Sequence, residues 1–187
     1  MSPALAFESL VAQRQARVAV VGLGYVGLPL AIEVAEEGFA TIGFDVSEAT
    51  VAHVNAGTSH VKDVASSRLA SLVESGQLHA TSSPTALADC DAILVCVPTP
   101  LNKVKDPDLS FVVAASKAIR DVLRPGHLVV LESTTFPGTT REVVLPLLAE
   151  SGLEVGTDFF LCYSPERVDP GNATWHTKNT PKVLGGV

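Results

Sequence analysis

A short apolar run that leads into three spaced glycines constrains the fold of this 187-residue chain more than any other feature. The run VAVV at 18–21 is followed by GLGYVG at 22–27 and then by an apolar segment that suits a helix. A strand, a tight glycine turn and a helix start form the context in which G-x-G-x-x-G binds a dinucleotide. Gly22 permits the turn, Gly24 lets the main chain approach a pyrophosphate, and Gly27 lets the helix pack closely on the strand. The diphosphate is expected on the unpaired N–H groups at the helix N-terminus.

An acidic residue stands at the spacing that such a site requires. The apolar stretch ATIGF at 40–44 ends in Asp45, which is 45 − 22 = 23 residues after Gly22. This is close to the spacing of roughly 20 residues at which an acid binds the adenosine ribose hydroxyls. Asp45 would also repel a 2′-phosphate, and no Arg or Lys follows nearby to bind one, so the pattern favours NAD over NADP. In the alternative interpretation, Asp45 and Ser47 cap the helix that follows.

The composition narrows the class of protein. Only 5% of the residues are aromatic, 47% are hydrophobic and the net charge is −7. Apolar aliphatic residues suit parallel strands buried between helices, whereas an acidic chain without a basic run argues against nucleic acid or an anionic membrane surface as partner. The three cysteines, Cys90, Cys96 and Cys162, have no metal-ligand spacing, and we expect Cys96 and Cys162 to be buried inside strands rather than nucleophilic. We expect no metal site, no membrane span and a cytoplasmic location.

Strand-like and helix-like segments alternate along the chain. This alternation predicts an α/β fold, a Rossmann-type doubly wound parallel sheet flanked by helices, with the strand order 3-2-1-4-5-6. Residues 1–16 are interpreted as a lead-in and residues 17–187 as the NAD-binding domain. The expected strands are 17–21, 40–44, 77–81, 91–97, 127–131 and 159–163, and the expected helices are 25–37, 47–56, 66–74, 109–123 and 139–150.

Polar and special residues follow five of these strands. The glycines follow the first and Asp45 the second, and VPTP at 97–100, STT at 133–135 and SPER at 164–167 follow the next clear strands. Ligands of an open parallel sheet bind outside the carboxyl ends of its strands, so these loops are expected to converge on one site. Each loop also has a purely structural interpretation: prolines end strands, hydroxyls cap a helix, and Glu166 pairs with Arg167 on the surface.

Four stretches carry a family resemblance from Arg17 onward: VGLGYVGLPLA, VCVPTPLNKVKDPDLSFV, ESTTFPGTTREVV and YSPERVDPGNATWHTKNTPKVLGG. Together they resemble the N-terminal domain of the UDP-glucose/GDP-mannose dehydrogenase family. STTFPGTT and SPERVDPGN are most similar to UDP-N-acetylglucosamine 6-dehydrogenases, and next to UDP-N-acetylmannosamine dehydrogenases.

The resemblance implies an oxidoreductase that oxidises the C6 alcohol of a UDP-sugar (UDP-N-acetylglucosamine, UDP-N-acetylmannosamine or UDP-glucose) to the uronate with two NAD, for polysaccharide biosynthesis. It implies that a cysteine captures the aldehyde and that water hydrolyses the resulting thioester. By position, Thr134 would orient the catalytic water and Glu166 would be the acid/base of hydrolysis. The cofactor contacts expected overall are Gly22, Gly24, Tyr25, Val26, Gly27, Asp45, Val97, Pro98, Thr99, Ser133 and Thr134.

The sequence departs from the family pattern in two places and in its extent. Pro170 stands where some members carry a second acid, and Thr50 stands where some carry a basic residue. The family's catalytic cysteine, linking helix and nucleotide-sugar domain do not follow Val187, so we expect this chain to bind NAD, to be inactive alone and to form a homodimer only with that helix. The alternatives are a non-catalytic NAD-binding or sensing module and a β-hydroxyacid-type dehydrogenase domain.

Overall fold

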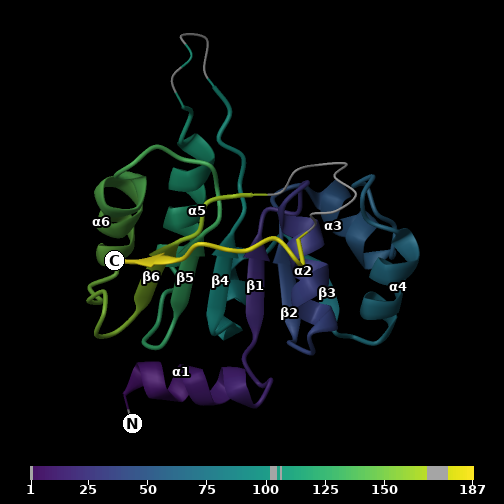
Figure 1. Ribbon diagram of the computed structural model, residues 1–187, viewed down its shortest axis with the longest axis horizontal. Helices are drawn as coiled ribbons and strands as arrows, with labels where there is room; N and C mark the ends of the chain where they lie inside the picture. The colour runs from purple at the N-terminus through teal and green to yellow at the C-terminus, as the bar shows by residue number, and fades with distance from the viewer. Residues whose placement is uncertain (1, 102–104, 106, 168–176) are drawn as a thin grey trace.

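The computed structural model describes residues 2–101, 105, 107–167 and 177–187, and within them the chain forms one seven-stranded sheet (Figure 1). The strand order is β3-β2-β1-β4-β5-β6-β7, which confirms the predicted order. The first six strands are parallel, and β7 pairs with β6 in the antiparallel direction. The strands are β1 (Val18–Val21), β2 (Thr41–Phe44), β3 (Leu78–Thr81), β4 (Ala92–Val95), β5 (Leu128–Leu131), β6 (Phe160–Tyr163) and β7 (Gly185–Gly186).

Helices cover both faces of the sheet. Because side chains alternate along a strand, Val20 packs in the layer of α2, α3 and α4, whereas Val21 packs in the layer of α5 and α6. Strands buried on both faces explain the nearly uninterrupted apolar runs of the sequence. The helices on the two faces are α2 (Gly27–Glu36), α3 (Glu48–Asn55), α4 (Ser66–Glu74), α5 (Ser110–Arg120) and α6 (Leu145–Ala149), and a 3₁₀ turn η1 (Pro84–Asp89) precedes β4.

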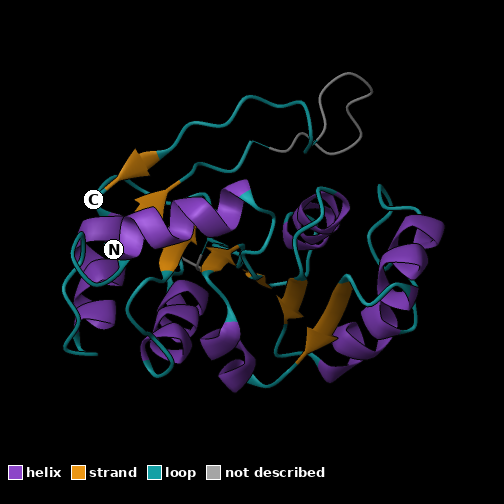
Figure 2. Cartoon of the chain, turned by 90° about the horizontal axis from the view of Figure 1, so that it is seen from below, coloured by secondary structure: helices purple, strands orange, loops and turns teal. Residues whose placement is uncertain are grey.

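The two ends of the described chain lie on the outside of this sandwich. Helix α1 (Pro3–Ala12) crosses below the amino ends of the strands and buries none of its residues (Figure 2). Residues 177–187, here called the C-terminal segment, run over the sheet on the side of α2 and end in β7 beside β6 (Figures 1 and 2). Lys178 attaches the start of this segment to α2 through an ion pair with Glu37 of 3.2 Å.

The segment predicted to be helical over 139–150 is helical, but part of it is not α-helical. The segment begins as a π-helical turn, η2 (Thr140–Val144), and only then becomes α-helical. Pro146 explains the change, because it has no N–H with which to bond the carbonyl of Glu142. A wider turn takes up the resulting mismatch. None of the helices within the described ranges is long and apolar enough to cross a membrane.

Candidate cofactor site

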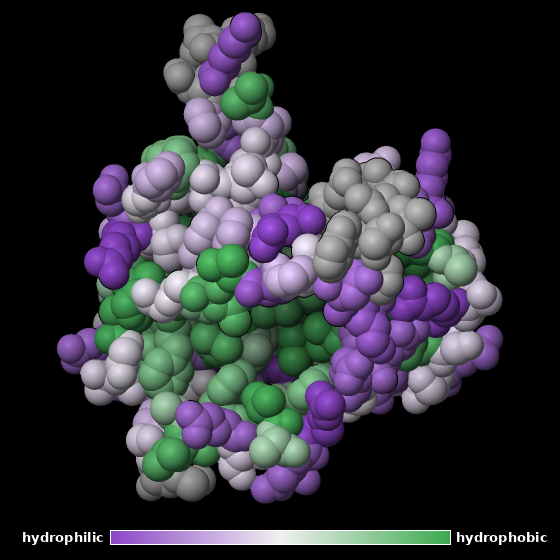
Figure 3. Space-filling model, viewed as in Figure 1, coloured by the Kyte–Doolittle hydropathy of each residue, from purple (hydrophilic) through white to green (hydrophobic). Residues whose placement is uncertain are grey.

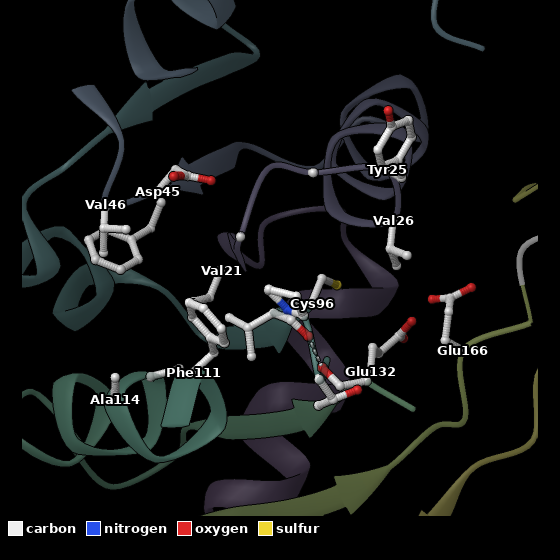
Figure 4. A pocket seen from close by; sticks show the side chains of 18 of the residues that line it. Val21, Tyr25, Val26, Asp45, Val46, Cys96, Phe111, Ala114, Glu132 and Glu166 are labelled. Carbon is white, nitrogen blue, oxygen red and sulfur yellow. Dashed lines mark hydrogen bonds between the residues drawn. The ribbon is translucent and has the colours of Figure 1, made fainter. Parts of the chain in front are cut away.

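A cavity of about 640 Å³ opens at the carboxyl ends of the strands (Figure 4). The loops after β1, β2, β4, β5 and β6 all contribute to it, so the five predicted loops do converge. All of the predicted cofactor residues line the cavity except Gly27, and Glu166 lines it as well. The topology explains the position, because the strand order reverses between β1 and β4 and leaves a crevice there.

The three glycines of the motif meet different surroundings. At Gly22, φ is +89° and a Cβ would lie 2.8 Å from the carbonyl oxygen of Cys96, so both the backbone and the packing require glycine. A Cβ on Gly27 would lie 1.7 Å from the carbonyl oxygen of Gly22. Gly27 is thus packed closely against the loop and does not line the cavity. A Cβ on Gly24 would meet no atom within 4 Å. The open space in this loop therefore lies beside Gly24, toward the cavity.

The N-terminus of α2 is open to a ligand. Its N-cap residue, Val26, offers no side-chain hydrogen bond to the first N–H groups of the helix. Leu28 already donates its N–H to the carbonyl of Gly24 at 3.1 Å and Pro29 has no N–H, so it is mainly the positive end of the helix dipole that would attract a phosphate group here. Gly24 and Val26 therefore border a place that fits a diphosphate in both shape and charge.

Asp45 lines the cavity and also holds the loops in place. Its Oδ2 accepts the N–H of Leu23 at 2.8 Å, and its Oδ1 accepts the N–H of Ser47 at 2.9 Å. The helix cap itself comes from Ser47, whose hydroxyl accepts the N–H of Thr50. The alternative interpretation, in which Asp45 and Ser47 cap this helix, is thus correct for Ser47. Asp45 instead fixes the glycine loop against β2. Each carboxylate oxygen keeps acceptor capacity for a second donor such as a ribose hydroxyl.

Hydrogen bonds connect the loop after β4 to the loop after β5, and both loops line the cavity. The hydroxyl of Thr99 donates to the carbonyl of Thr134 at 2.5 Å, and the buried hydroxyl of Ser133 donates to the carbonyl of Val97 at 2.8 Å. The Thr134 side chain is exposed on this edge. The prediction placed these residues together correctly, although the hydroxyl of Ser133 serves the protein's own backbone.

Sequence reasoning missed part of the cavity wall. Phe111, Ala114, Ala115 and Ala118 of α5 form an apolar side of the cavity together with Val46. Nothing in the periodicity of α5 distinguished residues that face this cavity from residues that face the core. Within the described part of the chain, no Lys or Arg lines the cavity, and no group of three or more His, Cys, Asp or Glu is placed to hold a metal ion.

Glu132 is the second residue that the prediction missed. It follows β5 directly, its side chain is 6% exposed, and it accepts a hydrogen bond from the ammonium group of Lys182 in the C-terminal segment. Glu166 lies near it on the loop after β6, where its Oε1 accepts the N–H of Arg167 at 2.8 Å (Figure 4). Glu132 precedes the STT stretch by one residue, so the rule that ligands bind at strand ends could have identified it.

Cys96 differs from the prediction in its position. It was expected inside a strand, but β4 ends at Val95, so Cys96 begins the following loop and lines the cavity. Burial raises the pKa of the Cys96 thiol well above its usual value, and the charges of Glu132 and Glu166 raise it further. Burial likewise raises the pKa of Cys90 to about 11. These thiols are therefore neutral and weakly nucleophilic near neutral pH, as expected.

Comparisons with known proteins agree with this geometry. The family model "UDP-glucose/GDP-mannose dehydrogenase family, NAD binding domain" matches residues 16–187. A UDP-N-acetyl-D-glucosamine 6-dehydrogenase from Pseudomonas aeruginosa is 41% identical over 171 residues, which are 91% of this chain and 40% of that protein. A UDP-N-acetyl-D-mannosamine dehydrogenase from Pyrococcus horikoshii is 36% identical over 172 residues, 91% of this chain and 41% of that protein.

Solved structures of dehydrogenases are also similar to this chain. A UDP-D-ManNAc dehydrogenase structure from Pyrococcus horikoshii aligns with a TM-score of 0.84 at 36% identity, covering 91% of this chain and 41% of that one. A ternary complex of GDP-mannose dehydrogenase from Pseudomonas aeruginosa aligns with a TM-score of 0.86 at 32% identity and the same coverage. The chain thus spans about 40% of the length of these relatives. With a dinucleotide cavity at the switch point of a Rossmann-type sheet and a family model that matches nearly all of it, this chain belongs to the UDP-glucose/GDP-mannose dehydrogenase family, whose matched region is the NAD-binding domain.

Proposed function

We propose that this chain is the cofactor-binding part of a nucleotide-sugar 6-dehydrogenase, with residues 1–16 as a lead-in and residues 17–187 as the NAD-binding domain. The whole protein would oxidise the C6 alcohol of a UDP-sugar to the uronate. The names of the relatives support UDP-N-acetylglucosamine or UDP-N-acetylmannosamine as the substrate. The three cysteines are free, which supports a reducing location such as the cytoplasm. A homodimer would depend on regions of the relatives outside the part matched here.

The residues of the cavity fit NAD along its length. The diphosphate would lie against Gly24 and the N-terminus of α2, and the adenosine ribose would bind Asp45. The apolar side formed by Val46 and Phe111 suits an adenine ring. The nicotinamide would then lie toward Thr99, Thr134 and Glu166. Figure 4 shows Glu166 at the opposite side of the cavity from Asp45. The absence of Lys and Arg among the described lining residues favours NAD over NADP.

The chemistry divides between the cofactor and the protein. NAD supplies the acceptor for hydride from the sugar alcohol. Glu166 would hold and move a proton at its carboxylate during thioester hydrolysis, and Thr134 would orient the attacking water with its hydroxyl.

The open space beside Gly24 is the observation that carries the proposal. We expect the Gly24→Ala variant to fold as stably as the wild-type chain, because its Cβ meets no protein atom. The same methyl group would occupy space needed by the diphosphate, so its affinity for NAD⁺ should fall at least about tenfold. Isothermal titration calorimetry with NAD⁺ and NADP⁺, together with thermal unfolding, measures both effects.

Gly186→Ala in β7 is the matched control. A Cβ there also meets nothing within 4 Å, and the position lies outside the cavity lining. Its affinity for NAD⁺ should equal that of the wild-type chain. Equal NAD⁺ affinity of the Gly24→Ala and wild-type chains, or no heat of binding for the wild-type chain at millimolar NAD⁺, would contradict the proposal.

A further inference from the structure

Glu132 and Glu166 line the side of the cavity opposite Asp45 (Figure 4), and Lys182 pairs with Glu132. Glu132 follows β5, Glu166 follows β6, and Lys182 comes from the C-terminal segment. Figure 4 shows the side chains of Glu132 and Glu166 extending toward the same space beyond Cys96. We call Glu132, Glu166 and Lys182 the charge cluster. Its formal charge is −1, since Lys182 compensates one of the two carboxylates.

The charge cluster acts at short range on the cavity wall. Glu132 is almost completely buried, so its charge is poorly screened by solvent. All three charges act on the thiol of Cys96. Burial is the largest cause of its raised pKa; of the charges, Glu132 and Glu166 raise this pKa and Lys182 lowers it. Cys96 lines the same cavity as the two carboxylates. A ligand atom bound beside Cys96 would therefore experience the same opposing charges.

We propose that Glu132 alone would bias this site toward oxidised over reduced NAD and that Lys182 offsets this bias. The inference rests on the proposed function, which directs the nicotinamide toward Thr134 and Glu166. The nicotinamide ring carries a positive charge in NAD⁺ and none in NADH, and the rest of the two molecules has the same charge. The ratio of the two affinities therefore reports the electrostatic potential at the ring. Glu132 favours the charged ring, and Lys182 opposes that effect.

Opposite single substitutions give this proposal its test. In Lys182→Met, Glu132 remains as an uncompensated carboxylate, so the ratio of the NADH to the NAD⁺ dissociation constant should rise about tenfold. In Glu132→Gln, Lys182 remains as an uncompensated cation, so the same ratio should fall about tenfold. The double variant has no charge at either position, and its ratio should return close to that of the wild-type chain. Both dissociation constants are measured by titration of the 187-residue chain at pH 8 and low ionic strength.

Lys178→Met is the matched control. Lys178 lies in the same C-terminal segment, and its substitution changes the net charge by the same amount as Lys182→Met. Lys178 pairs instead with Glu37 beside α2 and does not line the cavity. Its affinity ratio should equal that of the wild-type chain. Lys182→Arg retains the positive charge and should also leave the ratio unchanged. Circular dichroism verifies folding, and Lys182→Gln replaces Lys182→Met if the methionine variant does not fold.

The outcomes separate this inference from the proposed function. If both single variants weaken NAD⁺ and NADH by the same factor, the pair has only a structural role and the inference is wrong. An equal shift of the ratio in Lys178→Met would assign the effect to net charge and would also overturn the inference. If the wild-type chain binds neither form, the proposed function itself is wrong.

Discussion

Gly24 and Gly27 belong to one motif, but the structure requires glycine at these positions for different reasons. Gly27 is needed by the protein itself, because its missing side chain makes room for the carbonyl oxygen of Gly22. Gly24 has open space on the side of the cavity, so only a ligand would need it to be glycine. The motif therefore combines a folding requirement with a binding requirement, and substitutions can separate the two.

We expect Gly27→Ala to destabilise the chain even without a ligand. A methyl group 1.7 Å from the carbonyl oxygen of Gly22 forces the loop or α2 to move, at a cost of about 3 kcal/mol. Urea unfolding of the ligand-free chain measures this loss. Gly24→Ala, measured under the same conditions, should unfold like the wild-type chain. Equal stability of the Gly27→Ala and wild-type chains would show that the glycine loop is less closely packed than described.

At the scale of elements, a partly buried polar cluster joins the amino ends of β4 and β5. The guanidinium group of Arg124 donates to the carbonyls of Ala88 and Cys90, each at 2.8 Å, and to the carboxylate of Asp91 at 3.1 Å. The N–H of Arg124 donates to Nδ1 of His127, which is completely buried just before β5. Burial, and next the charge of Arg124, lower the pKa of His127 to about 4.

This shift predicts a loss of stability at acidic pH. In the folded chain His127 stays neutral down to about pH 4, whereas an unfolded histidine takes up a proton near pH 6.5. Since the unfolded state binds more protons between these values, the stability is fully present above pH 6.5 and falls as the pH decreases toward 4. The loss from this residue is about 3 kcal/mol at most.

His127→Asn tests this pH dependence. Asn keeps a hydrogen-bond acceptor close to the position of Nδ1 but does not titrate. We expect the slope of the unfolding free energy between pH 6.5 and pH 4 to decrease in this variant, whatever its stability at pH 7. Urea unfolding at several pH values gives the slope. An unchanged slope would mean that carboxylates rather than His127 cause the acid sensitivity.

The elements also show which features of the fold were predictable from the sequence. The strand order followed from apolar runs separated by helical segments, because such runs suit parallel strands that are buried on both faces. The π-helical turn before α6 was missed, because a single proline, Pro146, changes the hydrogen bonding without changing the hydrophobic pattern. The expected strand 91–97 extends two residues beyond the end of β4 at Val95, and this error hid the place of Cys96 in the cavity.

The candidate site was predictable wherever a residue follows a strand, and less so elsewhere. The carboxyl ends of parallel strands meet at one edge, so the positions of Asp45, Thr99 and Thr134 could be predicted without coordinates. The ion pair between Glu132 and Lys182 joins residues far apart in the sequence, so no local sequence pattern predicts it. The apolar side formed by α5 was hidden for a similar reason, because helical periodicity does not say which neighbour a face meets.

At the scale of the whole molecule, the chain contains the cofactor cavity and spans about 40% of the length of its relatives. Its three thiols, Cys90, Cys96 and Cys162, all have a raised pKa, with burial as the main cause. A thiol that must capture an aldehyde needs thiolate character. None of these three thiols is therefore suited to the thioester chemistry proposed above.

We expect the 187-residue chain to form no NADH when it is incubated with NAD⁺ and UDP-N-acetylglucosamine. Absorbance at 340 nm measures NADH, and calorimetry on the same sample shows whether NAD⁺ is bound. The full-length dehydrogenase from Pseudomonas aeruginosa serves as the positive control. NADH formation by this chain above the background without protein would contradict the expectation and would place a complete sugar site within these residues.

The loops around the cavity are already joined to one another by the protein's own hydrogen bonds. Asp45 holds Leu23, Thr99 holds Thr134, and Ser133 holds Val97. A receptor organised in this way loses little conformational entropy when its ligand arrives. Association should consequently proceed in a single kinetic step, at a rate proportional to ligand concentration and without a slower rearrangement after the encounter.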